Sequence, residues 1–193
     1  IVPPTIYADL ATASPVLKEQ LAGVAAAKGV PFVDVALMAP VPGRGLATPA
    51  LACGPGSPLY AETVNGWGGR VEAIGERAGL AASRKLTRSI VTKGLTALLM
   101  ESMELAVARG DGDWAWNHLV AELTSIDEAF LLRLIGGTER HSRRRLEEMK
   151  AARELLGSEA LRSPMTEGVI ATLRRVTEGG MPEDLAHLGD SLL

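Results

Sequence analysis

The stretch from Gly79 to Gly110 constrains the fold of this chain more than any other part of its sequence. It reads GLAASRKLTRSIVTKGLTALLMESMELAVARG and predicts one continuous helix, which would be roughly 45 Å long at about 1.5 Å per residue. Because most of its residues are small or apolar, we expect it to be the spine of an all-helical domain or subunit interface. Its polar side chains share an arc of about 100°: Lys85, Ser89, Thr92, Lys93 and Thr96. That face is either solvated or turned toward a polar ligand.

The composition is that of a folded globular protein. The 193 residues are 47% hydrophobic and 22% charged, and the net charge of −3 argues against a general nucleic-acid binder. No run of eighteen apolar residues is present, so no membrane span is expected. A single cysteine and three scattered histidines offer neither an internal disulfide nor a metal-ligand spacing, and a reducing, cytoplasmic setting is expected. The opening IVPPTIYADL resembles an interior point of a longer protein, so we expect a fragment.

The first 77 residues alternate strand and helix signals. Short apolar runs bounded by Gly and Pro predict strands over 5–10, 30–38, 48–54 and 71–74. Ser14 followed by Pro15 is a typical helix start, and the helix should run to Gly29; another is expected over 59–67. This alternation indicates an α/β sheet unit.

From residue 78 onward only helix signals remain. After the turn at Gly110, Asp113 is a candidate N-cap for the next helix, and Ser125 or Asp127 should begin another. The segment 126–157 is interrupted by Gly136-Gly137, which predicts two helices or one strongly kinked helix. Shorter helices are expected over 164–180 and 182–193. We therefore expect two domains, residues 1–77 and residues 78–193.

The order of several motifs resembles the β-hydroxyacid dehydrogenase family, which includes 6-phosphogluconate and 3-hydroxyisobutyrate dehydrogenases. These motifs are DLATASP at 9–15, FVDVALMAPVPG at 32–43, the strand TPALACGP and GLAASRK at 79–85. The KG pair at 93–94 and RRRLEEM at 143–149 are similar to a phosphogluconate dehydrogenase-like branch with its own C-terminal helical domain of the DUF1932 type. The resemblance implies the C-terminal part of a Rossmann-type NAD(P)-binding domain followed by an all-α domain resembling the 6-phosphogluconate dehydrogenase C-terminal domain, with one long central helix.

The same resemblance implies a catalytic role for Lys85, which matches the lysine that shuttles the substrate hydroxyl proton while hydride passes to the nicotinamide. The family usually has an Asn four residues later, where this chain has Ser89, so water or Lys93 would complete the substrate site. The competing interpretation makes Lys85 a solvated helix-face lysine and Lys93 a lysine at the rim of an interface.

Two further segments correspond to parts of the family's site. Thr12 matches a position close to nicotinamide and substrate, although it could instead be a simple capping residue. The family's Ser-Gly-Gly substrate loop maps onto Met38, Ala39 and Pro40, which lose a backbone donor and add an apolar wall, so a bulkier or more apolar substrate is favoured. His141 and the arginines at 143–145 could bind a substrate anion, but a solvated helix face is the preferred interpretation.

The cofactor implied is NAD or NADP, but its glycine-rich turn is not found in this chain. GRG at 43–45 and GPG at 54–56 lack the third glycine and do not join a strand to a helix start. The leading hypothesis is an NAD(P)-dependent oxidoreductase acting on a hydroxyacid-like or related carbonyl compound. A non-catalytic helical dimerisation or ligand-binding module and an imine reductase-like enzyme are the alternatives. The long apolar helix also predicts a homodimer.

Overall fold

The computed structural model describes residues 5–157, 163–183 and 185 of the chain. It divides into two compact units, Ile1–Thr92 and Lys93–Leu193, each described by itself below. The dividing point lies inside the long helix α3 (Leu80–Ala108). The boundary predicted at residues 77 and 78 lies just before that helix and stays a prediction.

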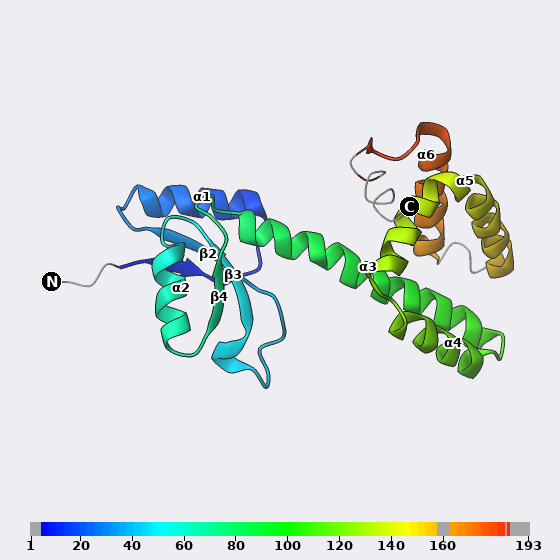
Figure 1. The fold of residues 1–193 in the computed structure, drawn as a ribbon, viewed down its shortest axis with the longest axis horizontal. Coiled ribbons are helices and arrows are strands. Elements are labelled where there is room, and N and C mark those ends of the chain that lie inside the picture. Colours follow the sequence, from blue (N-terminus) through cyan, green and yellow to red (C-terminus); the bar gives the residue numbers. More distant parts are fainter. Residues whose placement is uncertain (1–4, 158–162, 184, 186–193) are drawn as a thin grey trace. The chain divides into compact units, whose positions relative to one another are not determined.

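The first unit contains a four-stranded sheet in the order β1-β2-β3-β4, formed by β1 (Tyr7–Asp9), β2 (Phe32–Leu37), β3 (Pro49–Cys53) and β4 (Arg70–Ala73) (Figure 1). β1 is parallel to β2, β2 is antiparallel to β3, and β3 is parallel to β4. These directions determine how consecutive strands are connected. A loop can join the antiparallel strands β2 and β3, whereas a helix connects the two strands of each parallel pair. The predicted α/β unit is therefore confirmed.

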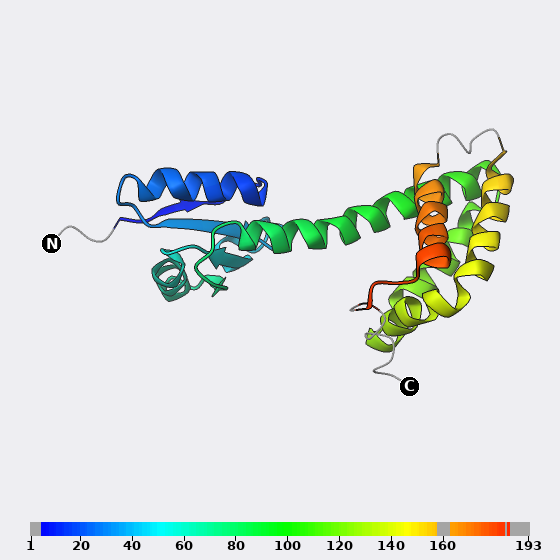
Figure 2. The same cartoon turned by 90° about the horizontal axis from the view of Figure 1, so that it is seen from above.

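Two helices complete this unit, α1 (Pro15–Ala26) and α2 (Ser57–Gly66). The predicted start of α1 is confirmed, because the Ser14 hydroxyl accepts from the Leu17 N–H and Pro15 occupies the first turn. Figure 2 shows α1 on one side of the sheet and α2 on the other. The first five residues of β2 are buried, as expected for a strand covered on both faces.

Alternation along β2 assigns its residues to the two faces. Val33 and Val35 pack with Ala50 and Ala52 in a cluster that includes Tyr60 of α2. The opposite face carries Asp34 and Ala36, and Ala36 packs with Cys53 and with Ala81 at the start of α3. The α1 side of the sheet therefore also receives the first turn of α3.

The second unit is all-helical. It holds the later part of α3, then α4 (Gly112–Thr124), α5 (Glu128–Leu156) and α6 (Pro164–Gly179). α5 packs on α6 through Leu146, Ile170 and Leu173. The Glu101 side chain of α3 accepts hydrogen bonds from the Met165 and Thr166 backbone N–H groups, each at 2.9 Å, and so caps the start of α6. The predicted fold class, an α/β remnant followed by an all-α domain, is confirmed.

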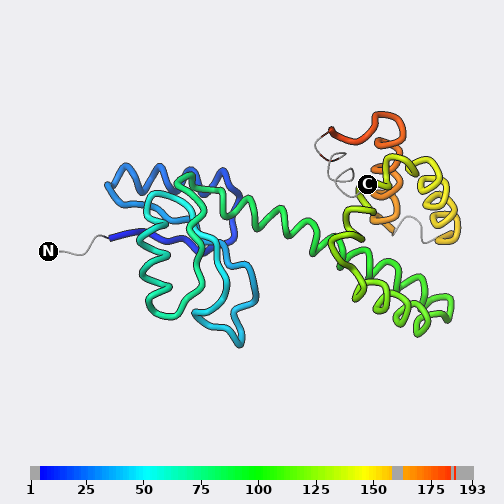
Figure 3. Tube along the Cα trace, in the orientation of Figure 1, coloured from blue at the N-terminus to red at the C-terminus, as the bar shows by residue number. Residues whose placement is uncertain are grey.

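Some sequence predictions for the second unit need correction or lie outside the description. α5 is one continuous helix through Gly136 and Gly137, not two, and its trace bends strongly along its length in Figure 3, in agreement with the second alternative, one strongly kinked helix. Arg145 braces this stretch, because its guanidinium donates to the Leu134 carbonyl at 3.2 Å and also bonds the Thr138 hydroxyl. The helix after Gly110 has Asp111, not Asp113, at its N-cap position. Most of the helix predicted over 182–193 lies outside the described residues.

Within the described ranges, no helix combines the length and apolarity needed to cross a membrane.

Candidate active site

Lys85 and Thr12 meet across a hydrogen bond. The Lys85 Nζ donates to the Thr12 Oγ1 at 3.3 Å, although the residues are 73 positions apart in the chain. Thr12 lies in the loop between β1 and α1, whereas half-buried Lys85 lies near the start of α3, and both belong to the first unit. They line a small pocket of about 10 Å³, room for about one water-sized group, together with Ala11, Ala13, Lys18, Asp34, Val35, Ala36, Ala82 and Leu86.

The pocket lies where parallel sheets usually bind ligands, beyond the carboxyl end of a strand. β1 ends at Asp9, shortly before Thr12. Gly79 brings Lys85 to this place, because it has a φ of +87° and a Cβ there would lie 2.8 Å from the Pro15 carbonyl oxygen. Only glycine tolerates both the dihedral and the close approach. The start of α3 can therefore lie against the start of α1, and Lys85 comes within reach of Thr12.

Beneath the pocket lies a buried ion cluster, a name we use for Lys18, Asp9 and Asp34. Lys18 is 1% exposed and Asp34 is fully buried. The Lys18 Nζ donates to the Asp9 carbonyl at 3.0 Å and to the Asp9 Oδ2 at 2.9 Å, and it lies 3.3 Å from the Asp34 Oδ1. This last contact is an ion pair only, because no hydrogen-bond donor is aligned with Oδ1. Sheet register brings the two carboxylates together, since Asp9 pairs with Asp34.

The other oxygen of Asp34 holds the first turn of α3. Its Oδ2 accepts from the Ala82 N–H at 3.0 Å and from the Cys53 thiol at 3.5 Å, while the Cys53 Sγ accepts from the Ala81 N–H at 3.2 Å. These contacts satisfy N–H groups that a helix start leaves without an intrahelical partner. Burial, reinforced by the Asp34 carboxylate and only partly opposed by the Ala81 N–H, raises the pKa of the Cys53 thiol.

Asp9 is held in its ionised form. Burial disfavours its charge, but hydrogen bonds from Lys18 and from the Ala11 N–H, together with the positive charge of Lys18, outweigh that effect. The pKa of Asp9 is therefore lowered from its usual value. Because Ala11 precedes Thr12, the same carboxylate also fixes the loop that carries the Thr12 hydroxyl.

The predicted substrate loop at Met38, Ala39 and Pro40 follows β2 directly. Its Met38 N–H already donates to the Pro49 carbonyl at 2.8 Å, and Pro40 has no N–H, so two of its three backbone positions offer no donor to a ligand. The Met38 side chain packs against the cluster that contains Ala36 and Cys53. Arg88, one turn after Lys85, donates from its guanidinium to the Met38 carbonyl. α3 therefore contacts the loops after both β1 and β2.

The structure does not bring the other predicted site residues into hydrogen-bond contact with this pair. Ser89 is half-buried one turn after Lys85, and Lys93 is exposed at the first position of the second unit. Neither forms a side-chain hydrogen bond with Lys85 or Thr12 in the part of the chain that is described. Their assignment as substrate-binding residues therefore stays a prediction.

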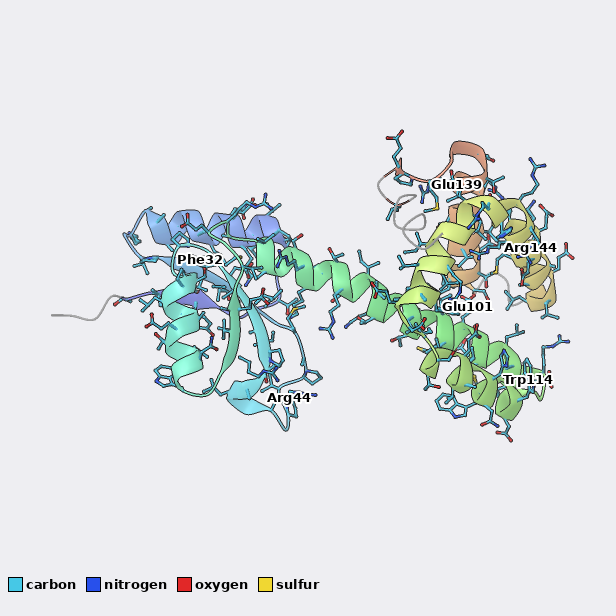
Figure 4. The ribbon with its side chains drawn as sticks, viewed as in Figure 1. Phe32, Arg44, Glu101, Trp114, Glu139 and Arg144 are labelled. Carbon is cyan, nitrogen blue, oxygen red and sulfur yellow. The ribbon has the colours of Figure 1, made fainter. Side chains whose placement is uncertain are left out.

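The basic run on α5 is divided between two environments. His141, Arg143 and Arg144 are exposed, and Figure 4 shows the Arg144 side chain on α5. Arg145 instead bonds groups of its own helix, as described above. This arrangement agrees with the preferred interpretation of a solvated helix face.

Four residues in or around the pocket were not predicted from the sequence: Lys18, Asp9, Asp34 and Arg88. One signal was available, because Asp34 is a carboxylate in the middle of the apolar strand FVDVAL, and a buried charge requires a partner. Nothing in the local sequence distinguishes Lys18 from an exposed helix lysine.

The glycine turns of this chain do not form a cradle for a cofactor pyrophosphate. Contrary to expectation, the GPG segment at 54–56 does join a strand to a helix, β3 to α2. A Cβ at Gly54 would lie 2.4 Å from the Phe32 carbonyl oxygen, and one at Gly56 would lie 2.8 Å from the Val33 side chain, so this turn packs against its own sheet. Gly43 and Gly45 face open space in an exposed loop with positive φ values. The loop around Thr12 is different, because it offers small side chains and one hydroxyl beside the pocket.

Part of the helical region is similar to a known family. Residues 106–176 match the family described as "Domain of unknown function (DUF1932)". No curated protein matches the chain in sequence.

Solved structures extend the likeness to known proteins to the α/β part of the chain. A conserved hypothetical protein from Sinorhizobium meliloti 1021 is 28% identical, with a TM-score of 0.53 over 97% of this chain and 66% of that protein. A conserved protein described as structurally similar to 3-hydroxyacid dehydrogenases is 25% identical, with a TM-score of 0.55 over 96% of this chain and 68% of that protein. The chain thus spans about two thirds of their length. The resemblance to the β-hydroxyacid dehydrogenase superfamily is confirmed.

An imine reductase from Myxococcus stipitatus, solved in complex with NADP+, shares the fold with a TM-score of 0.70. It is 19% identical, and the match covers 96% of this chain and 70% of the reductase.

Proposed function

We propose that this protein is an NAD(P)-dependent oxidoreductase that transfers hydride between a nicotinamide cofactor and a hydroxyacid-like or related carbonyl compound. The observation that carries the proposal is the hydrogen bond between the Lys85 Nζ and the Thr12 Oγ1. An amine and a hydroxyl from distant parts of the chain meet at a pocket beyond the end of β1, as proton transfer at a bound alcohol or carbonyl requires.

The residues present fit the nicotinamide end of NAD or NADP. The pocket itself holds only about one water-sized group, so a flat ring would lie over its mouth, against the small side chains of the loop from Ala11 to Ala13, where Thr12 is exposed. A bound nicotinamide would supply the hydride donor or acceptor. The pyrophosphate would have to be held by residues other than the glycine turns of this chain, because those turns pack against their own sheet or face open space.

In this proposal Lys85 moves the proton. In the oxidative direction its amine accepts the substrate hydroxyl proton as the carbon gives up hydride, and in the reductive direction its ammonium returns that proton to the carbonyl oxygen. The Thr12 hydroxyl orients the amine, since it already accepts a hydrogen bond from Nζ. Ser89 and Lys93 would contact the substrate farther along α3.

The substrate is expected to be bulkier or more apolar than the smallest hydroxyacids. The loop at Met38, Ala39 and Pro40 has few N–H groups with which to bind a carboxylate, because the Met38 N–H is engaged and Pro40 lacks one. A substrate with an apolar substituent loses less binding free energy at this loop than a compact, highly polar substrate, because fewer of its polar groups would be left without a hydrogen bond.

The test is a kinetic screen of the protein expressed from its complete coding sequence, with NADH and NADPH in one direction and NAD+ and NADP+ in the other. The panel contains aliphatic and aromatic 3-hydroxyacids, the matching keto acids and a cyclic imine. For any substrate turned over, Lys85→Ala should lower kcat by at least about a hundredfold, the usual scale of general acid-base catalysis. Lys28→Ala is the matched control, because Lys28 is an exposed lysine just after α1.

Three outcomes separate the hypotheses. Hydroxyacid turnover that depends on Lys85 supports the proposal. Turnover of the imine alone, unaffected by Lys85→Ala, would favour an imine reductase-like enzyme. A well-folded protein that neither binds a nicotinamide cofactor in calorimetry nor turns over any panel member would favour the non-catalytic module.

A further inference from the structure

We propose that the buried ion cluster is a positioning device for the Lys85–Thr12 pair, and that Asp34 is the residue on which the position of Lys85 depends. The inference rests on the proposed function for its catalytic meaning. Its structural content concerns contacts within the first unit alone, which can be tested without any substrate.

The first half of the device is Asp34 acting on α3. Its Oδ2 accepts from the Ala82 N–H at 3.0 Å, and Ala82 lies one helical turn before Lys85. Cys53 adds a second anchor, since its Sγ accepts from the Ala81 N–H and its thiol donates to the same Asp34 oxygen. A carboxylate near the positive end of a helix dipole binds it more strongly than a neutral group. Asp34 therefore fixes the helix turn that precedes Lys85.

The second half is Lys18 acting on the Thr12 loop. Lys18 ties the Asp9 carbonyl and carboxylate to α1, and the remaining Asp9 oxygen accepts from the Ala11 N–H at 3.1 Å. These bonds hold the backbone directly before Thr12. Because the Lys18 Nζ also lies 3.3 Å from Asp34, one buried cation joins the support of Thr12 to the support of Lys85.

Stability alone is a poor explanation for this arrangement. Apolar side chains of similar volume often stabilise a protein core as well as a buried ion pair does. The Asp34 Oδ1 is buried without an aligned hydrogen-bond donor, and Asp34 and Lys18 line the same pocket as Lys85 and Thr12. The buried charges of Asp34 and Lys18, which are unfavourable for folding, thus lie next to the Lys85–Thr12 pair that the proposed reaction needs.

The first experiment measures the position of the Lys85 amine without a substrate. Lysines of the full protein are acetylated with trace acetic anhydride, and the rate at Lys85 is compared with that at exposed Lys28 by mass spectrometry. Asp34→Asn should raise the Lys85:Lys28 ratio at least threefold, because Lys85 is released from Thr12. Glu19→Gln, at an exposed position next to Lys18, should leave the ratio unchanged.

Thermal unfolding and continued protection of buried Lys18 show whether each variant keeps its fold. If Asp34→Asn does not fold, Asp9→Asn replaces it, because Asp9 lies at the edge of the cluster with 12% of its side chain exposed. An unchanged Lys85:Lys28 ratio in a folded variant overturns the inference. An increase in the acetylation rate of Lys85 that is accompanied by an equal increase at Lys18 also overturns the inference, because it would show that the whole first unit opens.

The second experiment is a double-mutant cycle in the active enzyme. Asp34→Asn should lower kcat about tenfold with little change in KM, and should cause no further loss in a Lys85→Ala background. Equal losses in both backgrounds would mean a merely structural role and would overturn the inference. Wild-type activity in Lys85→Ala would instead refute the proposed function, while the labelling result would still decide whether Asp34 positions Lys85.

Discussion

Lys18→Met tests most directly how much the buried ion cluster contributes to the stability of the first unit. Methionine keeps the length and most of the volume of the lysine but removes the cation from the buried ion cluster. The change leaves the fully buried Asp34 carboxylate with only the Ala82 N–H and the Cys53 thiol as partners. We expect the first unit to lose stability because the buried Asp34 carboxylate would lose its positively charged partner.

The magnitude follows from the exposure of each partner. Breaking a buried ion pair by removing one member costs about 3 to 5 kcal/mol. At the fully buried Asp34, the whole free-energy penalty of an unpaired buried charge should apply. Asp9, with 12% of its side chain exposed, can recover part of its hydration. We therefore expect a loss in the free energy of unfolding at the lower end of that range, about 3 kcal/mol, since water can partly solvate one of the two carboxylates, that of Asp9.

Amide hydrogen exchange of peptides covering β2 (Phe32–Leu37) is the suitable assay, because it reports the opening of the first unit separately from the helical unit. A loss of about 3 kcal/mol should accelerate exchange by at least about a hundredfold, since each 1.4 kcal/mol is about tenfold. Lys28→Met is the control. If Lys18→Met lies within about 0.5 kcal/mol of that control, the ordinary range for a surface substitution, the reasoning about the cluster is wrong.

Three further predictions concern other parts of the chain. Glu101→Ala should destabilise the helical unit by about 1 to 2 kcal/mol in urea unfolding, which is the scale of a lost helix cap. The reason is that the α6 backbone N–H groups would lose their hydrogen bonds to Glu101. An equal effect of Glu104→Ala, at an exposed position of the same helix, would contradict this. Because the pKa of Asp9 is lowered on folding, its ionisation stabilises the first unit above its ordinary pKa of 3.8, and this contribution is lost as the pH falls through the folded value. Asp9→Asn should therefore flatten the decline in stability below about pH 4, and an unchanged slope would show that Asp9 contributes nothing. Light scattering should show a homodimer at micromolar concentration that Trp114→Glu weakens at least about tenfold and Trp67→Glu does not, both side chains being about 70% exposed; a wild-type monomer would rule the dimer out.

Local signals in the sequence were enough for most of the fold. Ser14 and Pro15 mark the start of α1 because their preferences are those of a cap and a first turn, which depend on few distant contacts. The long helix was predicted from Gly79 to Gly110 and extends from Leu80 to Ala108. The Gly136-Gly137 pair predicted two helices or one strongly kinked helix in this segment but could not decide between them, because the bond from Arg145 to the Leu134 carbonyl is a contact that the glycines themselves do not reveal.

The candidate site was less predictable. Thr12 and Lys85 were selected through the family resemblance, and their contact needed the backbone geometry of Gly79. The cluster behind them depends on the register of β1 against β2, which sets Asp9 beside Asp34, and on the burial of a lysine whose local sequence is that of any surface helix. Such pairings are properties of the sheet and not of any one segment.

The continuity of α3 across the two compact units matters for how the protein can be divided in the laboratory. A truncation after Thr92 would leave thirteen residues of this helix on the first unit. Helices of that length are marginal in water without tertiary support, and exposed Ile90 and Val91 would end up beside a frayed terminus. Fragments for spectroscopy or segmental isotope labelling should therefore keep the helix whole and end in the turn at Gly110.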